Sequence, residues 1–339
     1  MVSLSDVQSS NSRIASSLPP GLVAVFVGAT NGIGEATLQQ FVKHARQPRV
    51  YFVGRSQEAG DRIAAECKTL NPAGGYTFIN ADVSLIRVVD EVCRDIKSKE
   101  KSINLLFLSQ GTLVPGVETL EGLHYAAALV VHSRNRFIVN LLPLLQNATA
   151  LRRVVSVFAA TKEGPINMTD FQGWKVPLMS QRGHASSIVT LSLEALAKKA
   201  PTVAFVHDFP GPVKSGIARG TKGALFFVIK AVFTVIGPMV NMPTVESGER
   251  HVYLATSARY PAGANGDAAS GVPLADGIAV ARGTSSKTGS GIYSVDAQGE
   301  TAGPMVEEFL AKMRNVGMVD QVWAHVEDDF ERITGLKAA

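Results

Sequence analysis

Cysteines, dense clusters of one charge and long apolar runs are all scarce in this chain of 339 residues, and each shortage excludes a class of protein. The two cysteines, Cys67 and Cys93, fall in segments with helical periodicity and lack the spacing of metal ligands, which argues against a disulfide framework and against a metal site. The net charge is +4, but lysine and arginine are spread along the chain, so no nucleic-acid partner is expected. These features favour a reducing, cytoplasmic setting and an anionic small ligand.

Neither the N-terminal segment nor the most apolar stretch has the pattern of a targeting or membrane segment. Residues 1–20 are rich in serine and have no continuous apolar core, so they lack the pattern of a secretory signal, and we predict a flexible arm. Residues 224–236 are apolar but are divided by Lys230 and followed by Pro238. We interpret residues 220–245 as an apolar lid or pocket helix; the alternatives are contact of 224–236 with a membrane surface and a true transmembrane helix.

Abundant apolar residues and a regular alternation of patterns predict an α/β domain. Hydrophobic residues make up 46% of the chain and charged residues 18%, which is enough apolar material for one large core. Short apolar strands are predicted at residues 22–27, 50–53, 76–79, 104–108, 153–157 and 202–206. Amphipathic helices are predicted at residues 35–44, 59–70, 88–99, 121–145 and 185–199. We therefore expect one Rossmann-type domain, a doubly wound parallel sheet, over residues 21–339.

The last part of the chain carries weaker patterns. Residues 262–291 are rich in glycine, alanine and serine, which predicts loops over the edge of the sheet. Residues 303–335 return to helical periodicity with a break at Gly317, which predicts a helical tail packed on the domain.

A glycine-rich turn directly follows the first predicted strand and opens a helix. It contains Gly28, Thr30, Asn31, Gly32, Ile33 and Gly34. Backbone N–H groups in such a turn, together with the N-terminus of the helix, can closely approach a pyrophosphate. The plain alternative is a tight turn packed under a helix.

The glycine spacing resembles that of the short-chain dehydrogenase/reductase family, Gly-x-x-x-Gly-x-Gly, and the resemblance covers roughly residues 20–220. In that family an acidic residue after the second strand would bond a bare ribose, whereas this chain has Arg55 followed by Ser56, and Arg55 can pair with a 2′-phosphate. Asp82 and Val83 match the family's adenine contact. The resemblance therefore implies binding of NADP(H) in preference to NAD(H).

Two further motifs match the family's nicotinamide side. Ser109 and Gly111 lie in a segment where the family usually has Asn-Asn-Ala-Gly. Residues 210–215 resemble the Pro-Gly motif that closes over nicotinamide, which implies contacts from Pro210, Gly211, Val213 and Ser215, the last bonding the carboxamide. Each match has a plain alternative: Arg55 as a surface charge, Asp82 as a helix cap, and Pro210-Gly211 as an ordinary turn.

The family's proton-transfer residues are not matched. The family uses a Tyr with a Lys four residues later, a Ser and an Asn, but this chain has no tyrosine between Tyr125 and Tyr253. The Tyr, Lys, Ser and Asn positions fall near Arg182, Ser186, Ala159 and Val130 or Val131.

His184 is the local candidate for proton transfer, because imidazole titrates near neutral pH, and Arg182 could stabilise an oxyanion. The alternative is that His184 packs or caps the helix start while Arg182 binds a phosphate or carboxylate. His132 and Arg134 could join the site across the cleft, or could be structural.

Residues 104–111, 133–137, 153–157 and 182–184 are also similar to a branch of large fungal short-chain reductases associated with secondary metabolism. That resemblance implies an apolar natural-product substrate, and the wider family implies a dimer or tetramer. We favour an NADPH-dependent reductase of a carbonyl or activated double bond. A redox-neutral isomerase or cyclase and a non-catalytic NADP-binding protein are the alternatives.

Overall fold

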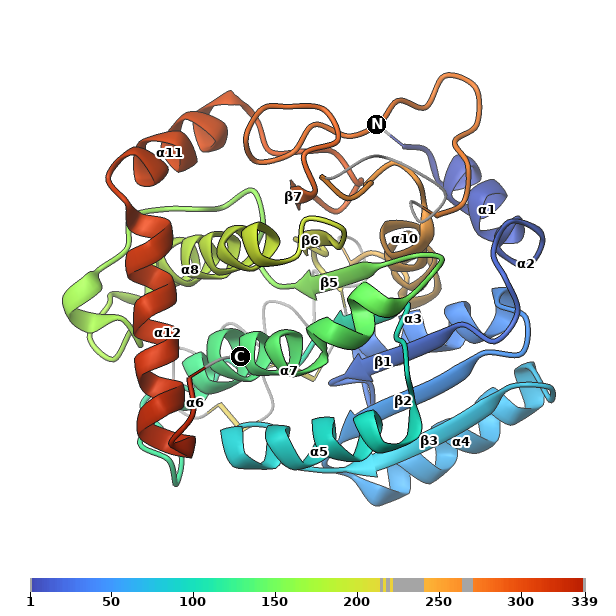
Figure 1. Cartoon of the computed structure of the whole chain (residues 1–339), viewed down its shortest axis with the longest axis horizontal. Helices are drawn as coiled ribbons and strands as arrows, with labels where there is room; N and C mark the ends of the chain where they lie inside the picture. Colours follow the sequence, from blue (N-terminus) through green and yellow to red (C-terminus); the bar gives the residue numbers. More distant parts are fainter. Residues whose placement is uncertain (1, 214–215, 218–219, 222–240, 264–270, 338–339) are drawn as a thin grey trace.

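The computed structural model describes residues 2–213, 216–217, 220–221, 241–263 and 271–337 (Figure 1). Its centre is a seven-stranded sheet in the order β3-β2-β1-β4-β5-β6-β7, in which every neighbouring pair is parallel. The strands are β1 Val23–Val27, β2 Arg49–Gly54, β3 Gly75–Asn80, β4 Leu105–Leu108, β5 Arg153–Val157, β6 Ala204–Asp208 and β7 Ile292–Val295. The predicted doubly wound Rossmann-type fold is confirmed.

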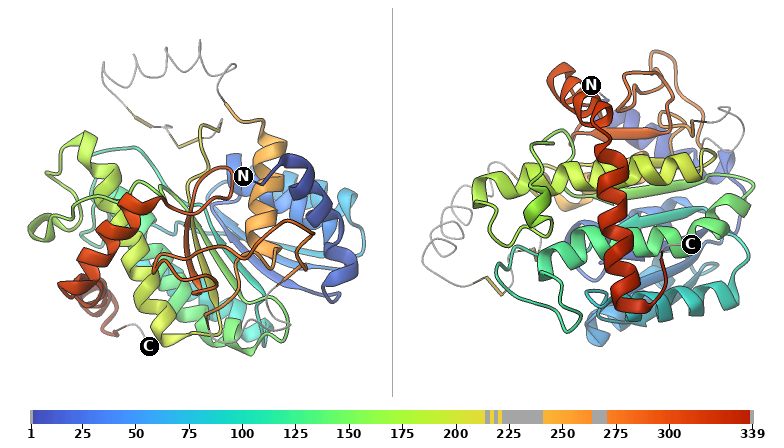
Figure 2. Two further views of the ribbon diagram at one scale, coloured as in Figure 1. Left: turned by 90° about the horizontal axis from the view of Figure 1, so that it is seen from above. Right: turned by 60° about the vertical axis from the view of Figure 1, so that its left-hand side comes forward.

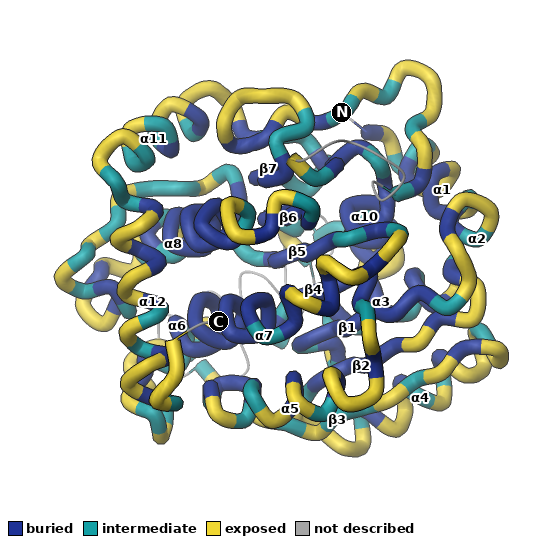
Figure 3. The backbone as a smooth tube through the Cα atoms, in the orientation of Figure 1, coloured by how far each residue is buried: buried dark blue, intermediate teal, exposed yellow. Residues whose placement is uncertain are grey.

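Helices cover both faces of the sheet, as the two views of Figure 2 show. One layer contains α3 Gly32–His44, α4 Gln57–Leu70 and α10 Thr244–Thr256. The other contains α5 Ile86–Lys99, α7 Ser133–Asn147 and α8 Leu178–Lys199, with α6 Tyr125–Ala127 and a π-helical turn, Ala128–His132, leading into α7. A short 3-10 helix, Met168–Asp170, lies in the loop after β5. Because helices cover both faces, strands β1, β4, β5 and β6 are buried along their whole length (Figure 3).

The C-terminal helices complete the second layer. Helix α11 spans Pro304–Asn315 and α12 spans Met318–Thr334, and α12 packs across α8 and α5 (Figure 1). Gly317 between them has a φ of 70°, in the left-handed region that favours glycine, so the predicted break at this residue is where the tail changes direction.

The prediction of a flexible N-terminal arm is wrong. Helices α1 Leu4–Ser12 and α2 Ile14–Ser17 are present, and α1 packs against α10. Val7, Ile14 and Leu18 are almost fully buried, and Asn11 donates a 2.9 Å hydrogen bond to the backbone oxygen of Glu249. The apolar residues of this N-terminal segment are too few to form a continuous run. Their spacing nevertheless places them on the face of the short helices that packs against the core.

Three other expectations need correction. The helix predicted from residue 121 begins at Tyr125, because residues 119–123 form a tight turn in which Thr119 N–H donates to the Leu123 carbonyl. Helix α10 and strand β7 were not predicted, and α10 starts inside the range interpreted as a lid. Residues 222–240 of that lid, which include the whole of 224–236, lie outside the described residues. Within the described ranges, no helix is long and apolar enough to cross a membrane.

Candidate functional site

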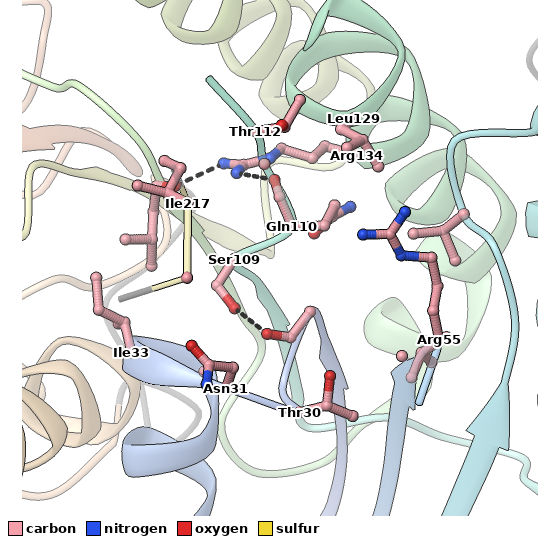
Figure 4. Close-up of a pocket in the computed structure, with 18 of the residues that line it drawn as sticks. Thr30, Asn31, Ile33, Arg55, Ser109, Gln110, Thr112, Leu129, Arg134 and Ile217 are labelled. Atoms are coloured by element: carbon pink, nitrogen blue, oxygen red, sulfur yellow. Dashed lines mark hydrogen bonds between the residues drawn. The ribbon is translucent and has the colours of Figure 1, made fainter. Parts of the chain in front are cut away.

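A cavity of about 260 Å³ lies at the carboxyl ends of the strands, where β1 and β4 are neighbours. From β1 the chain continues to β2 and β3 on one side, whereas β4, β5 and β6 follow on the other. This reversal of strand order leaves a crevice outside the sheet, which is where open α/β folds bind ligands. Figure 4 shows the side chains that line it.

The glycine turn between β1 and α3 forms the floor of this cavity. Gly28 has a φ of 82°, and a Cβ there would lie 2.5 Å from the Gln110 backbone nitrogen. A Cβ on Gly34 would lie 2.4 Å from Ser109 Oγ, so both glycines allow the turn to pack against the chain that leaves β4. Asn31 precedes α3 without giving it a side-chain cap, and Asn31, Ile33 and Gly34 all line the cavity. The N-terminus of α3 is thus available to an anionic group.

Most residues predicted to bind a cofactor are brought together in this cavity. Those that line it are Gly28, Thr30, Asn31, Ile33, Gly34, Arg55, Asp82, Val83, Ser109, Gly111 and Pro210. Gly32 is the first residue of α3, and it lies outside the set of lining residues. The same wall includes several residues that the sequence motifs did not single out, namely Thr112, Leu129, Val157, Phe158 and Ile217.

Four predicted cofactor residues lie elsewhere or cannot be placed. Ser56 precedes α4, and its Oγ accepts a 3.3 Å hydrogen bond from Ala59 N–H as a helix cap. Gly211, with a φ of 72°, turns the chain beside Ala297, and Val213 forms an isolated parallel bridge with Met242. Ser215 lies outside the described residues.

Arg55 extends from the end of β2 towards the cavity. Its Nη1 donates a 2.6 Å hydrogen bond to the Tyr125 hydroxyl, and no acidic side chain in the described part of the protein forms an ion pair with it. Asp82, after β3, lines the cavity while its Oδ1 accepts a 3.0 Å hydrogen bond from Ser84 N–H. The cap interpretation of Asp82 is therefore compatible with a ligand contact.

His184 is not among the residues that line the cavity. Its Nδ1 accepts a 3.1 Å hydrogen bond from Asn167 N–H, and its Nε2 donates a 3.0 Å hydrogen bond to the Phe171 carbonyl. The side chain is buried, which lowers the pKa of the imidazole. Because both ring nitrogens hold the loop before α8, this geometry matches the packing interpretation and leaves no free nitrogen for proton transfer to a substrate.

Arg182 also lies outside the set of lining residues. Its guanidinium stacks 4.5 Å from the centre of the Phe209 ring, and desolvation lowers its pKa. Phe209 directly precedes Pro210, which lines the cavity, so exposed Arg182 contacts a neighbour of the cavity wall and is not itself among the lining residues.

His132 and Arg134, two residues apart, have different surroundings. His132 is buried, and its Nε2 lies 2.9 Å from an Asp329 carboxylate oxygen on α12. Arg134 lines the cavity. Of the two, only Arg134 joins the site.

Ala159 and Ser186, which lie near the expected positions of the family's Ser and Lys, are in contact with each other. Ser186 Oγ donates a 2.6 Å hydrogen bond to the Ala159 carbonyl, and both residues are buried. The titratable residues among those described as lining the cavity are Arg55, Asp82 and Arg134, with no tyrosine, lysine or histidine among them.

Comparison with known proteins agrees with this architecture. The family model for short chain dehydrogenase matches residues 22–142. The chain is 38% identical over 332 residues to an oxidoreductase of Emericella nidulans, covering 96% of this chain and 97% of that protein. It is 28% identical to a short-chain dehydrogenase/reductase of Stachybotrys chartarum, covering 91% and 92% of the two chains. Among solved structures, L-sorbose reductase from Gluconobacter frateurii, complexed with NADPH and L-sorbose, has a similar fold, with a TM-score of 0.53, 17% identity and coverage of 71% and 92%.

Proposed function

Because this chain belongs to the short-chain dehydrogenase/reductase family, we propose that it is an NADPH-dependent reductase of a carbonyl or activated double bond in an apolar natural-product intermediate. The single observation that carries the choice of cofactor is Arg55, a cation at the end of β2 with no acidic partner in the described chain. A guanidinium at that position suits a 2′-phosphate, whereas an acidic side chain there would accept hydrogen bonds from a free ribose diol.

The cavity wall fits such a cofactor along its whole length. The glycine turn and the N-terminus of α3 would hold the pyrophosphate, because they offer N–H groups without side chains in the way. Asp82 and Val83 would flank the adenine, whereas Gly111 and Pro210 lie on the far side of β1, where the nicotinamide would be placed. When bound, the cofactor supplies a hydride.

Apolar side chains near the cavity favour an apolar substrate. Leu129, Phe158 and Ile217 line it, and exposed Leu113 donates its backbone N–H to the Ile217 carbonyl. Further exposed apolar residues occur in the loops after β4 and β5, at Val117, Leu120 and Trp174. Pockets of this composition bind ligands mainly by burying apolar surface, while a few polar groups fix the orientation. The natural-product class rests on the resemblance to fungal reductases of secondary metabolism.

The reaction is tested by incubating the purified protein with NADPH and a panel of apolar ketones and enones, while NADPH absorbance and product mass are followed. We expect substrate-dependent NADPH oxidation with product two hydrogens heavier than its substrate. Tight NADPH binding without oxidation, together with substrate rearrangement at constant mass, would favour the redox-neutral alternative instead. The absence of tyrosine, lysine and histidine from the described cavity wall is the observation that keeps this alternative open.

A further inference from the structure

Arg134 forms a buried positive centre where β4 and β5 end. Its Nη1 donates 2.9 Å hydrogen bonds to Ser156 Oγ and the Val157 carbonyl. Its Nη2 donates to the Gln110 carbonyl (Figure 4). The side chain is 3% exposed and yet belongs to the cavity wall. The guanidinium is therefore fixed against the strand ends on the side of β1 away from Arg55.

These contacts do not use all of the donors of Arg134. A guanidinium has five N–H bonds, and the three acceptors above leave two without a partner in the described chain. One of them is Nε–H, a buried atom with no hydrogen-bond acceptor. A buried donor without an acceptor destabilises the fold by roughly 1–3 kcal/mol. The Nε–H of Arg259 is buried in the same way, so what distinguishes Arg134 is its place in the cavity wall together with an Nη2 N–H that has no acceptor in the described chain.

The charge of Arg134 is also uncompensated. Within the described ranges no carboxylate forms an ion pair with it, and residues 214–240, most of which lie outside those ranges, contain no aspartate or glutamate. The nearby His207 is neutral, because burial and the charge of Arg134 lower its pKa to about 3, so it changes nothing in this balance. A buried cation without an anion is costly unless a ligand supplies the negative charge.

We propose that Arg134 binds the substrate oxygen on which negative charge develops during reduction. This inference rests on the proposed function. With NADPH bound, its hydride would go to the carbonyl carbon, or to the β-carbon of an enone, and the π electrons would move to oxygen while NADP+ is left. The alkoxide or enolate oxygen would accept a hydrogen bond from the remaining Nη2 N–H of Arg134. It would then take a proton from a water molecule, which becomes hydroxide. A fixed cation in a water-poor site stabilises such an oxyanion without reorganisation.

The approach to this guanidinium is open on the cavity side. An added Cβ on Gly111 would lie 3.8 Å from Arg134 Nη2 and 3.7 Å from Val130 Cγ2, so the glycine leaves space directly in front of the cation. Thr112 and Phe158 border the same region of the wall. An oxygen carried by an apolar body fits a cation surrounded by these groups.

The test uses benzoate as a probe, because it joins a delocalised oxyanion to an apolar ring. Benzoate binding to the full-length protein saturated with NADP+ is measured by calorimetry for the wild type and Arg134→Met. We expect affinity to fall roughly 10- to 100-fold in Arg134→Met, the range expected for hydrogen bonds to a charged group. Equal affinity in both proteins, or no benzoate binding by the wild type, would overturn the proposal.

Arg153→Met is the matched control. Arg153 is also a buried arginine held by backbone carbonyls, those of Leu254 and Ser257, but it lies at the opposite end of β5. Its variant loses a comparable packing contact without touching the cavity, and we expect benzoate affinity to be unchanged. NADPH affinity is measured in parallel: Arg134→Met should retain it within about threefold, and loss of NADPH binding together with benzoate binding would assign Arg134 to the cofactor site instead. Failure of the wild type to bind NADPH would contradict the proposed function, independently of the benzoate result.

Discussion

The Arg55 guanidinium and the Tyr125 hydroxyl are 2.6 Å apart, which joins the end of β2 to the first turn of the helical segment that follows β4. Arg55 is exposed, so without this contact its long side chain would gain conformational entropy by leaving this position for other rotamers. Tyr125 therefore holds a flexible cation in the position where a 2′-phosphate would bind.

Tyr125→Phe should weaken NADPH binding roughly three- to tenfold and leave NADH binding unchanged, because it removes one hydrogen bond that orients Arg55. Fluorescence titration of both cofactors measures the two affinities. A parallel loss for NADPH and NADH would mean that Tyr125 supports the cavity in general and not the phosphate contact.

Gly28→Ala should weaken NADPH binding at least tenfold. Its φ of 82° and the 2.5 Å approach to the Gln110 nitrogen leave no room for a methyl group without moving the turn. The left-handed conformation alone costs about 1–2 kcal/mol for alanine. Gly75→Ala is the control, since nothing lies within 4 Å of an added Cβ and its φ is not in the left-handed region. Equal behaviour of the two variants in cofactor titration and thermal unfolding would contradict this account.

His184→Ala should lower stability while leaving NADPH affinity and turnover nearly unchanged, because the ring bonds the backbone of Asn167 and Phe171 outside the cavity. Burial lowers the pKa of His184, so the unfolded chain takes up the proton first as pH falls below about 6.5, and the stabilisation is lost progressively as pH drops towards the folded pKa. The difference in unfolding free energy between wild type and variant should therefore be smaller near pH 5 than near pH 7. A turnover loss of a hundredfold or more would restore His184 as the proton donor.

Asn11→Ala should destabilise the protein by about 1–3 kcal/mol, because Asn11 Nδ2 bonds both the backbone oxygen and the carboxylate of buried Glu249. Ser12→Ala, which removes only a local 2.8 Å bond to the Ser9 carbonyl at the surface, should have little effect. Urea unfolding of the two variants gives the comparison. An Asn11 variant as stable as wild type would indicate that its hydrogen bonds to Glu249 contribute nothing to stability.

Local motifs predicted residues that do line one cavity, because the Gly28 turn and Arg55 are each positioned by the strand they follow. The structural role of His184 could not be predicted from a local motif. Its surroundings are set by the long loop that folds back from β5 onto the start of α8, and nothing in the neighbouring residues specifies that path.

Arg134 illustrates a second limit of sequence patterns. Residues two apart on a helix point in nearly opposite directions, so His132 faces α12 while Arg134 reaches the strand ends. Helical periodicity predicts that the two side chains diverge, but it does not say which of them faces the cavity, because that depends on how the helix packs on the sheet. Strand β7 was missed for a simpler reason: four residues after a glycine-rich stretch are too few to form a recognisable pattern.

The most direct test of the central claim is a fluorescence titration of the wild type and Arg55→Glu with NADPH and NADH, with Arg94→Glu, an exposed residue of α5, as the charge-matched control. We expect the wild type and Arg94→Glu to bind NADPH at least tenfold more tightly than NADH, and Arg55→Glu to lose that preference. Equal affinity of the wild type for the two cofactors, or no binding of either, would contradict the assignment of this cavity to NADPH.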